Sequence, residues 1–486
     1  MPSEQDLIAE RKKKAEQLRE LGINPYPYSF AVSATATALA ETYGGLSADG
    51  KTQDVFSVAG RILGFRRLGK ISFAHILDHT GKIQLYFRED DLGDRYALLK
   101  LFDGGDWIGA KGTVFRTKAG ELSIAVTEFS MLCKSLRPLP EKWHGLTDVE
   151  SRYRKRYVDL IMNPQVRKEF RLRSRILDAV RTTLKGKDYL EVETPVLEST
   201  YGGAAARPFR SYLHSLKMDI FLRISLELPL KKLIVGGFDR VFEISKVFRN
   251  EDIDRSHNPE FTMMEAYCAY ADFEGMMDLT EDIYIACAKA IHGKTKVQYQ
   301  EHALDFKKPW PRLSMVEAIK KYEGSDVMAM TDEEIKKKLP PDVVQKASCR
   351  GELVQAMFEE FVEEHLIQPT FITHHPKETT PLCKACRENP EFAIERFEPF
   401  CCGMEIGNAY SELNDPVLQR ALLEEQAAQL RAGNAEANPM DEEFVEAIEY
   451  GMPPTGGLGL GMDRLVMLMT NQSSIRDVIL FPFMKQ

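Results

Sequence analysis

The 486-residue sequence has no long apolar run, no dense cysteine pattern and no dinucleotide-binding glycine motif. A membrane-spanning helix needs about 20 consecutive apolar residues, and no segment approaches that length. The start, MPSEQDLIAERKKKAEQLRE, is charged and lacks the apolar centre of a signal peptide. Eight cysteines in so long a chain do not form a disulfide framework. We therefore expect a soluble, cytoplasmic protein with no membrane association.

Charge and length set loose bounds on the protein. The sequence has 64 lysines and arginines against 73 aspartates and glutamates, a net charge of -9. Binding to nucleic acid depends on local basic patches, so this total does not exclude it. The hydrophobic content of 44% is ample for a core. The length suggests about three domains.

Residues 241–270, VFEISKVFRNEDIDRSHNPEFTMMEAYCAY, read as an antiparallel hairpin around a charged loop. Val241–Arg249 and Phe261–Tyr270 alternate as strands do, and an Asn-Pro turn signal lies between them. One face of the second strand is expected to carry Phe261, Met263, Glu265 and Tyr267. Together with Arg249, this face offers a guanidinium, a carboxylate, a ring and a phenol. That set suits a ligand with a phosphate, a flat base and an ammonium group.

The N-terminal third reads as a basic helix followed by a small barrel. Residues 5–22 form the helix, whose charge is either a solvated face or an accessory contact to a phosphate backbone. Residues 54–135 contain five short, glycine-punctuated strands, typical of a closed barrel of the oligonucleotide-binding type. Phe73 lies near several arginines and a lysine. A ring beside positive charge can stack a base, although aromatic strand residues are more often part of the core.

From residue 166 the sequence changes to longer elements. A long amphipathic helix runs to Gly186, and a short strand then closes on Pro195. The segment MDIFLRISLELPLKKLIVGG is expected to contain a strand with Arg223, Ser225 and Glu227 on one side. A charge facing inward on a sheet is costly unless it has a partner.

The segment 369–416 concentrates acidic residues. Glu398 and Glu405 stand seven apart across a turn expected at Cys401–Gly403, so a hairpin can bring them together. Two converging carboxylates beside a phosphate-binding arginine suit Mg²⁺, a hard ion that prefers oxygen ligands. Asn408, Tyr410 and Glu412 follow on alternate positions of the next strand.

The cysteines of the same segment leave a zinc site open as an alternative. Cys383-x-x-Cys386 has a zinc-like spacing, and His374 and His375 lie nearby. Adjacent cysteines, such as those of the expected turn, rarely both bind one tetrahedral ion, and no histidine stands at a zinc-like interval. We therefore expect reduced thiols.

The C-terminal segment GMPPTGGLGLGMDRLVMLM is a glycine-rich strand that opens a helix. Its glycines leave room for a ligand against the strand, and a helix start favours a phosphate. The pattern is not GxGxxG after a βαβ strand, so a dinucleotide fold fits poorly.

Three of these segments resemble, in order, the three motifs of class II aminoacyl-tRNA synthetases. The helix and strand closing on Pro195 are similar to motif 1, which builds a dimer interface around that proline. FRNEDIDRSHNPEFTMMEAY is similar to motif 2, and the glycine-rich strand with its helix to motif 3. More narrowly, the chain resembles the lysine-specific enzymes, whose subgroup also holds the aspartate and asparagine enzymes. The resemblance implies an α+β protein, with an N-terminal β-barrel of oligonucleotide-binding type before an antiparallel-sheet catalytic domain with helices.

The resemblance also implies a domain plan and a reaction. Residues 1–53 are a helical lead-in, 54–136 an anticodon-binding barrel, 137–165 a linker and 166–486 the catalytic domain. A helical insertion at 312–367 is expected to take no part in catalysis. The implied reaction uses ATP and Mg²⁺ to ligate L-lysine to tRNA(Lys) through a lysyl-adenylate, in a homodimer.

By the same resemblance, particular residues bind particular ligands. The catalytic residues are Arg249, which bridges the lysine carboxylate and the α-phosphate, and Arg464, which binds the γ-phosphate. ATP is bound by Arg249, Glu251, His257, Asn258, Phe261, Glu398 and Arg464. Lysine is bound by Gly203, Glu227, Arg249, Glu265, Tyr267, Asn408, Tyr410, Glu412 and Gly459. Mg²⁺ is held by Glu398 and Glu405, and the anticodon is read by Phe73, Gln84 and Glu121.

Three of these assignments have alternatives or conditions. Glu227 forms either the ligand contact or a structural ion pair with Lys231 or Arg240. Glu265 either binds the substrate ammonium or pairs with a neighbouring arginine. Family members often have Phe where Tyr410 stands, so the added hydroxyl must find a partner.

Two other functions are less well supported. An aspartate or asparagine enzyme is disfavoured, because Glu265 and Glu412 are negative where an aspartate pocket needs a cation. A lysyl transfer to a protein, or a scaffold that keeps only the fold, is disfavoured by the intact barrel. Relatives that lysylate a protein resemble the catalytic half alone.

Overall fold

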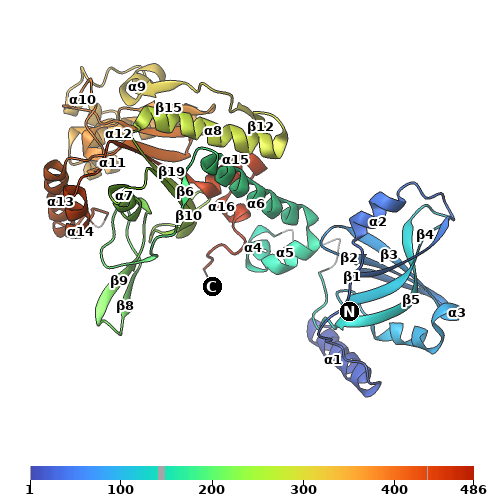
Figure 1. The fold of residues 1–486 in the computed structure, drawn as a ribbon. Coiled ribbons are helices and arrows are strands. Elements are labelled where there is room, and N and C mark those ends of the chain that lie inside the picture. Colours follow the sequence, from blue (N-terminus) through green and yellow to red (C-terminus); the bar gives the residue numbers. More distant parts are fainter. Residues whose placement is uncertain (1, 141–147, 435, 486) are drawn as a thin grey trace. The chain divides into compact units, whose positions relative to one another are not determined.

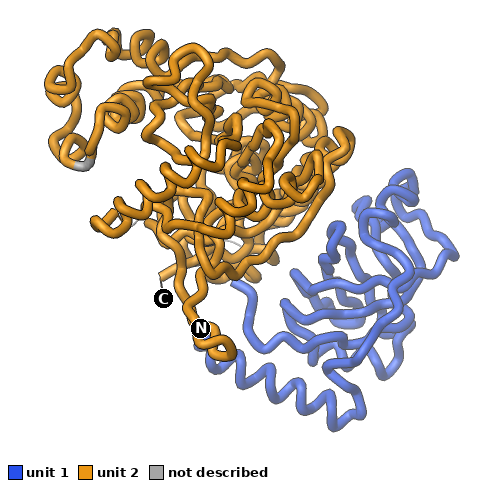
Figure 2. Tube along the Cα trace, turned by 60° about the vertical axis from the view of Figure 1, so that its left-hand side comes forward, with its two compact units in different colours: residues 1–147 blue, residues 148–486 orange. Residues whose placement is uncertain are grey.

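The computed structural model describes residues 2–140, 148–434 and 436–485. The chain divides into two compact units, Met1–Thr147 and Asp148–Gln486, which Figure 1 labels by element and Figure 2 colours separately. Within the described residues, no helix is long and apolar enough to cross a membrane. The finer bounds expected for lead-in, barrel, linker and catalytic domain stay predictions.

The first unit is built on a closed five-stranded barrel. Its strands pair in the order β1-β2-β3-β5-β4, and only β3 and β5 pair in parallel. The strands are β1 (Lys51–Leu68), β2 (Ile71–Leu77), β3 (Lys82–Arg88), β4 (Trp107–Arg116) and β5 (Leu122–Cys133). Inward side chains such as Ile62, Ile76, Phe87 and Ile124 form its core. The barrel predicted from the sequence is confirmed.

Four helical segments complete this unit. They are α1 (Glu4–Glu20), α2 (Ala36–Tyr43), α3 (Glu89–Leu92) and the 3-10 helix η1 (Gly93–Leu101). Arg11 of α1 is buried and donates to three backbone carbonyl oxygens, and Lys14 pairs with Asp103 at 2.7 Å. Part of the basic character of this helix therefore attaches it to the barrel. The polar lead-in also contains a helix, α2, which the sequence analysis did not predict.

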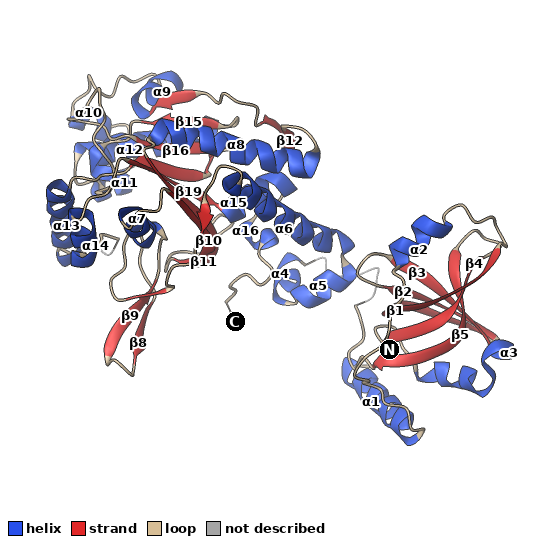
Figure 3. Cartoon of the chain, in the orientation of Figure 1, coloured by secondary structure: helices blue, strands red, loops and turns tan. Residues whose placement is uncertain are grey.

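The second unit is built on a nine-stranded sheet, drawn red in Figure 3. Its order is β14-β15-β16-β18-β19-β11-β10-β6, with β17 paired to β16. The β14–β15 and β10–β6 pairs are parallel, and the others are antiparallel. The strands are β6 (Leu190–Glu191), β10 (Arg240–Phe248), β11 (Glu260–Ala269), β14 (Arg312–Ser314), β15 (Thr370–Thr373), β16 (Arg396–Cys401), β17 (Met404–Glu405), β18 (Gly407–Ser411) and β19 (Thr455–Gly461).

Two small sheets flank this large one. One pairs β12 (Lys296–Tyr299) with β13 (His302–Asp305). The other has the order β7-β9-β8, from β7 (Leu197–Glu198), β8 (Arg210–Leu213) and β9 (Met218–Leu222).

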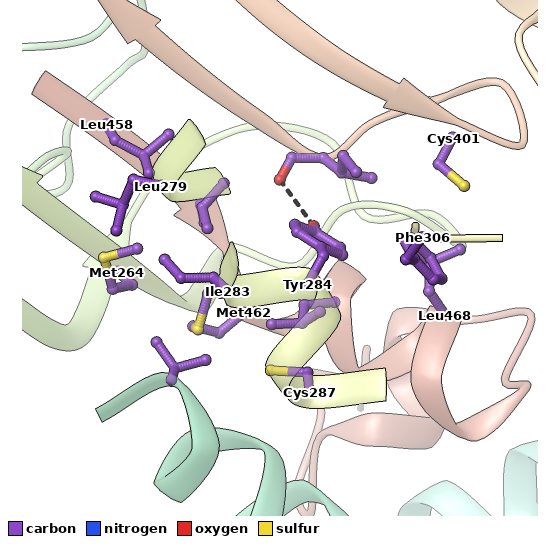
Figure 4. Packing of buried hydrophobic residues seen from close by; sticks show 14 of the residues in the cluster. Met264, Leu279, Ile283, Tyr284, Cys287, Phe306, Cys401, Leu458, Met462 and Leu468 are labelled. Carbon is purple, nitrogen blue, oxygen red and sulfur yellow. Dashed lines mark hydrogen bonds between the residues drawn. The ribbon is translucent and has the colours of Figure 1, made fainter. Parts of the chain in front are cut away.

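One face of the large sheet carries the main core. The helices packed there are α6 (Pro164–Lys185), α8 (Phe273–His292), α15 (Met462–Thr470) and α16 (Ile475–Val478). Figure 4 shows Ile283 of α8 beside Met264 of β11, and Leu279 of α8 beside Leu458 of β19. Tyr284 donates its hydroxyl to the Ile406 carbonyl at 3.3 Å, which satisfies a polar group inside this apolar cluster. Alternate side chains of β11 therefore face away from the core.

The opposite face of β11 is met by α7 (Glu227–Val235), which packs with α14 (Glu442–Glu449) in a second apolar cluster. The predicted strand through Glu227 is wrong, because β9 ends at Leu222 and α7 begins at Glu227. Pro229 explains the change. A proline without its N–H is tolerated in the first turn of a helix but interrupts a central strand.

The other helices lie between these elements. They are α4 (Val149–Arg154), α5 (Arg156–Met162), α9 (Met315–Tyr322), α10 (Asp332–Lys336), α11 (Pro341–Lys346), α12 (Arg350–Phe361), η2 (Glu363–His365), η3 (Lys377–Thr379) and α13 (Pro416–Arg431). The expected linker thus contains α4 and α5, and its residues 141–147 lie outside the described residues. The expected insertion is helical from α9 to η2, whereas its first residues form the edge strand β14 of the large sheet.

Candidate functional site

Two adjoining cavities lie on the face of the large sheet that carries the alternate side chains of β11. Their volumes are about 150 and 550 Å³. Both are lined by Arg249, Met263, Glu405, Asn408 and Gly459. Ligands in the two cavities would therefore meet at one set of side chains.

The smaller cavity gathers six of the seven residues expected to bind ATP. They are Arg249, Glu251, His257, Asn258, Phe261 and Arg464, while Glu398 lines the larger cavity. The Arg249 guanidinium lies 5.2 Å from the centre of the Phe261 ring. Arg464 Nη2 lies 3.5 Å from His257 Nε2. The walls therefore combine two cations with an aromatic ring, which suits phosphates attached to a flat base.

Asn258 differs from its neighbours in this cavity, because its amide is used inside the protein. Its Nδ2 donates to the Glu260 carbonyl at 2.6 Å, and its Oδ1 accepts from the Phe483 N–H at 3.3 Å. The side chain is buried. Asn258 thus holds the loop between β10 and β11 in shape.

The larger cavity is lined by all nine residues expected to bind lysine. They are Gly203, Glu227, Arg249, Glu265, Tyr267, Asn408, Tyr410, Glu412 and Gly459. Two glycines leave space for the polar groups. A Cβ at Gly203 would lie 2.9 Å from Ser225 Oγ, and one at Gly457 would lie 1.9 Å from Glu412 Oε1. Gly203 also has φ +84°, which favours glycine.

Glu265 lies at the buried end of this cavity and is held by neutral donors. Its Oε1 accepts from Ser225 Oγ at 2.9 Å and from the Leu226 N–H at 2.8 Å, and its Oε2 accepts from the Tyr267 hydroxyl at 3.0 Å. Burial, with the nearby Glu227 carboxylate, raises the pKa of Glu265 to about 7. No described arginine pairs with Glu265, so the arginine alternative is not seen.

A buried ion pair occupies the neighbouring wall. The Lys231 ammonium contacts the carboxylates of both Glu227 and Glu412. The Glu227–Lys231 pair considered from the sequence is therefore present, although Glu227 also lines the cavity. Burial raises the pKa of Glu412 to about 8, even though Lys231 acts to lower it.

Glu412 also has unused hydrogen-bonding capacity. Its Oε2 is engaged by the Lys231 ammonium in an ion pair, and its Oε1 is buried with no hydrogen-bond partner among the described residues. A buried, unpaired carboxylate oxygen is costly. Its position on the cavity wall therefore indicates a ligand that brings a donor.

Asn408 and Tyr410 form a chain with Arg396. Arg396 Nε donates to Asn408 Oδ1 at 3.0 Å, and Asn408 Nδ2 donates to the Tyr410 hydroxyl at 2.6 Å. The Tyr410 hydroxyl, which the sequence analysis expected to need a partner, therefore has one in Asn408. Arg396 also pairs with Glu398 and lies 5.8 Å from the centre of the Tyr410 ring.

Glu398 and Glu405 are joined by the hairpin of β16 and β17. Cys402 and Gly403 form its turn with φ of 52° and 68°, so the expected turn is confirmed. Both carboxylates line the larger cavity. Burial, together with the Glu398 charge, raises the pKa of Glu405.

This donor set fits a magnesium ion that arrives with phosphates. Two carboxylates provide hard oxygen ligands, and Mg²⁺ commonly takes only one or two of these with substrate phosphates and water. No group of three or more His, Cys, Asp or Glu side chains within the described residues could hold a metal unaided. The eight cysteines are free thiols in this structure, and their redox state stays a prediction.

The residues expected to read an anticodon come together on the barrel of the first unit. Gln84 Nε2 donates to Glu121 Oε2 at 2.7 Å, and the Glu121 Oε1 contacts His75 Nε2 at 2.7 Å. Phe73 is half-buried and lies outside the barrel core. Its ring centre lies 5.1 Å from that of Tyr86. The barrel therefore carries aromatic side chains and the Glu121 carboxylate, while the Gln84 amide is buried and bonded to Glu121 and Ser123.

Several residues of these surfaces were missed in the sequence. On the barrel they are His75, Tyr86 and Phe115, and on the larger cavity they are Arg396 and the α12 residues Glu352, Gln355 and Glu359. Tyr86 pairs directly with Phe73, so strand register was the available signal. The contact of α12 with the cavity could not be predicted from the sequence near α12, because it depends on how the insertion packs against the sheet. Three α12 residues of the expected insertion thus line the larger cavity, and the expectation that the insertion takes no part in catalysis stays a prediction.

Comparison with known proteins shows the same two-part organisation. Residues 148–485 match the family described as tRNA synthetases class II (D, K and N), and residues 56–132 match the OB-fold nucleic acid binding domain. The chain is 49% identical over 489 residues to the lysine--tRNA ligase of Moorella thermoacetica, covering 100% of this chain and 99% of that protein. It is 50% identical over 486 residues to the lysine--tRNA ligase of Halalkalibacterium halodurans, covering 99% and 97%.

Proposed function

Because this chain belongs to the class II synthetases of the aspartate, lysine and asparagine group, and within it to the lysine–tRNA ligases, we propose that its two adjoining cavities hold the two small substrates. The enzyme uses ATP to ligate L-lysine to tRNA for translation. The proposal places ATP in the smaller cavity and lysine in the larger one. The observation that carries it is the buried Glu412 Oε1, which lies on the wall of the larger cavity and has no hydrogen-bond partner among the described residues.

In the first step, a lysine carboxylate oxygen attacks the α-phosphorus of ATP, and pyrophosphate leaves. Arg249 lines both cavities, so it is the residue that would hold the attacking carboxylate against the α-phosphate. Phe261 stacks on adenine, Glu251, His257 and Asn258 surround the nucleotide, and Arg464 binds the γ-phosphate. No protein nucleophile is required, and catalysis rests on alignment and charge neutralisation.

Lysine is held at both ends in this scheme. Glu227 and the backbone near Gly203 bind the α-ammonium, while Glu265, Glu412 and Tyr267 surround the ε-ammonium. Asn408, Tyr410 and Gly459 complete the walls. Three buried carboxylates favour a substrate with two ammonium groups and disfavour an acidic one.

Glu398 and Glu405 would hold Mg²⁺ on the ATP phosphates. When bound, this ion neutralises phosphate charge and so makes the phosphorus easier to attack. Arg396 keeps Glu398 in place through its ion pair, and Arg464 lies 3.7 Å from Glu405 Oε2. Both carboxylates are thus positioned by cations of this chain.

In the second step, a terminal ribose hydroxyl of tRNA(Lys) attacks the lysyl-adenylate, and AMP leaves. The barrel, residues 54–136, would read the anticodon by stacking on Phe73 and by hydrogen bonds to Gln84 and Glu121.

The proposed domain plan keeps 1–53 as lead-in, 137–165 as linker and 166–486 as catalytic domain. Charging tRNA for translation places this work in the cytoplasm.

The catalytic units are proposed to associate as a symmetric homodimer. The segment Lys187–Leu197 contains β6, the edge strand of the large sheet, and exposes apolar side chains. Leu190, Val196 and Leu197 are 47%, 39% and 53% exposed. A free strand edge beside exposed apolar residues is suited to an isologous contact with a second copy.

Glu265→Gln and Glu412→Gln should each reduce kcat/KM for lysine by an amount equivalent to about 2–5 kcal/mol, because each leaves a buried ammonium with less opposing charge. The KM for ATP should change little. Pyrophosphate exchange at varied lysine and ATP measures both. Exposed Glu424→Gln on α13 is the control. Normal use of lysine by both pocket variants would contradict the pocket assignment.

Glu405→Ala and Glu398→Ala should abolish adenylate formation and retain part of the lysine binding, since these carboxylates hold Mg²⁺ rather than lysine. Adenylate formation and lysine binding are measured separately, by pyrophosphate exchange and calorimetry. Glu364→Ala, at a side chain 79% exposed, is the control.

Elemental analysis should find little zinc. A stoichiometric zinc ion on Cys383 and Cys386 would contradict the expectation of reduced thiols.

Phe73→Ala should weaken tRNA use by losing about 1–3 kcal/mol of stacking, whereas lysine-dependent pyrophosphate exchange stays nearly unchanged. Phe87→Ala, on the adjacent strand but 0% exposed in the barrel core, should instead lower the unfolding temperature. Aminoacylation, exchange and thermal melting separate the two cases. Equal losses in both assays for Phe73→Ala would show that Phe73 is structural.

Binding of tRNA should also weaken steeply with salt.

Leu197→Glu should convert the proposed dimer into monomers at micromolar concentration, because it places a charge in the apolar contact. Val417→Glu, at a side chain 79% exposed on α13, should leave the mass unchanged. Light scattering gives the mass of each variant. A fully active wild-type monomer would rule out the dimer as the working form.

A further inference from the structure

Lys231 is a buried cation to which the reaction scheme above gives no role. Its side chain is 0% exposed, and it lies behind the larger cavity rather than on its wall. The ammonium contacts Glu227 and Glu412 and lies 5.8 Å from the centre of the Phe444 ring. It therefore touches a carboxylate assigned to the α-ammonium of lysine and one assigned to its ε-ammonium.

The charges of this pocket balance only when Lys231 is counted. Three nine-tenths-buried carboxylates, Glu227, Glu265 and Glu412, surround the place assigned to lysine. The substrate brings two ammonium groups there, while its own carboxylate faces Arg249. Two substrate cations and one resident cation then match three carboxylates. Burying an unpaired charge is costly, so this balance has a physical basis.

We propose that Lys231 is a positioning residue for the lysine substrate, a resident ammonium that fixes the Glu227 and Glu412 carboxylates at the wall of the pocket and leaves the pocket two positive charges short once its three carboxylates are ionised. The inference rests on the proposed lysine pocket. Lys231 acts through the two carboxylates and does not touch the substrate. Its place in α7, four residues after Glu227, sets the contact with Glu227 from one helix turn, while Glu412 reaches Lys231 from beyond the end of β18.

The protonation of the pocket follows from the same arrangement. Burial would lower the pKa of Lys231, but Glu227 and Glu412 together raise it above its ordinary value, so Lys231 stays charged. Glu412, with its pKa raised to about 8, is protonated below that pH in the free pocket. Charged or titratable groups around it are Glu227 and Lys231 on α7, Glu265 and Tyr267 on β11, Arg396 on β16, Tyr410 on β18 and Cys383.

These directions predict the pH profile. Lysine needs ionised carboxylates, so kcat/KM for lysine should rise with pH as Glu265 and Glu412 lose protons, between about pH 6 and 9. Removing the Lys231 charge removes an influence that lowers the pKa of Glu412, so the rise should move to higher pH.

The experiment compares Lys231→Met and Lys231→Arg with a matched control, Lys232→Met. Lys232 is the next residue of α7 and forms a partly exposed pair with Glu443 at 2.9 Å. Lys231→Met should raise the KM for lysine about 100-fold or more, the scale of a broken buried ion pair, and leave the KM for ATP nearly unchanged. Lys231→Arg should keep the pH profile near that of wild type, and Lys232→Met should match wild type in every assay.

A double variant keeps the test valid if Lys231→Met folds poorly. Lys231→Met/Glu412→Gln removes one charge of each sign, so it should fold better than Lys231→Met. Its loss of kcat/KM for lysine should be clearly smaller than the product of the two single losses, because Lys231 acts in part through Glu412 and in part through Glu227. Independent, multiplying losses would overturn the proposal.

Two further outcomes separate this proposal from the pocket assignment. A Lys231→Met enzyme with a lower melting temperature but an unchanged KM for lysine and an unmoved pH profile would show that Lys231 only joins α7 to the end of β18. That result overturns the role of Lys231 and leaves the pocket intact. Normal use of lysine by both Glu265→Gln and Glu412→Gln would instead overturn the pocket itself.

Discussion

The catalytic unit depends on burying carboxylates on one face of a sheet whose other face is its apolar core. On β11, Met264 and Ala266 enter the core, while Glu265 and Tyr267 enter the cavity. A slip of one residue would exchange the two sets and put a carboxylate among the side chains of α8. The strand is held against this by pairing on both edges, with β10 and β19. The register of one central strand therefore supports both stability and chemistry.

Much of this arrangement could be predicted from local sequence. The β10–β11 hairpin follows from two alternating runs around an Asn-Pro signal, and its register places Glu243 opposite Glu265. The turn at Cys402–Gly403 follows from a glycine between two strands. The glycine-rich strand that opens α15 also forms as expected. Each of these features depends on residues close together in the sequence, so the spacing of apolar residues and glycines was enough to predict it.

Other features depend on contacts between distant segments, and the sequence did not show them. The alternation LRISLEL suits a strand as well as the start of a helix, and Pro229 was the overlooked signal. The acidic face of α12 reaches the cavity through packing of an insertion, which no spacing reveals. That Phe73 lies outside the barrel core could be predicted only from its pairing with Tyr86 on the neighbouring strand. Lys231 was visible as a possible partner of Glu227, but its second contact comes from Glu412, far along the chain.

The hydroxyl of Tyr410 has a consequence for selective inhibition. Arg396 is a pure donor, so Asn408 must turn its oxygen toward Arg396 and its nitrogen toward Tyr410. The tyrosine oxygen thus accepts a hydrogen bond and keeps its own proton to donate. A lysine analogue with an acceptor atom at that point would gain a hydrogen bond here, and none in an enzyme with phenylalanine at this position. The Tyr410 hydroxyl oxygen is therefore one atom by which an inhibitor could be made selective for this enzyme.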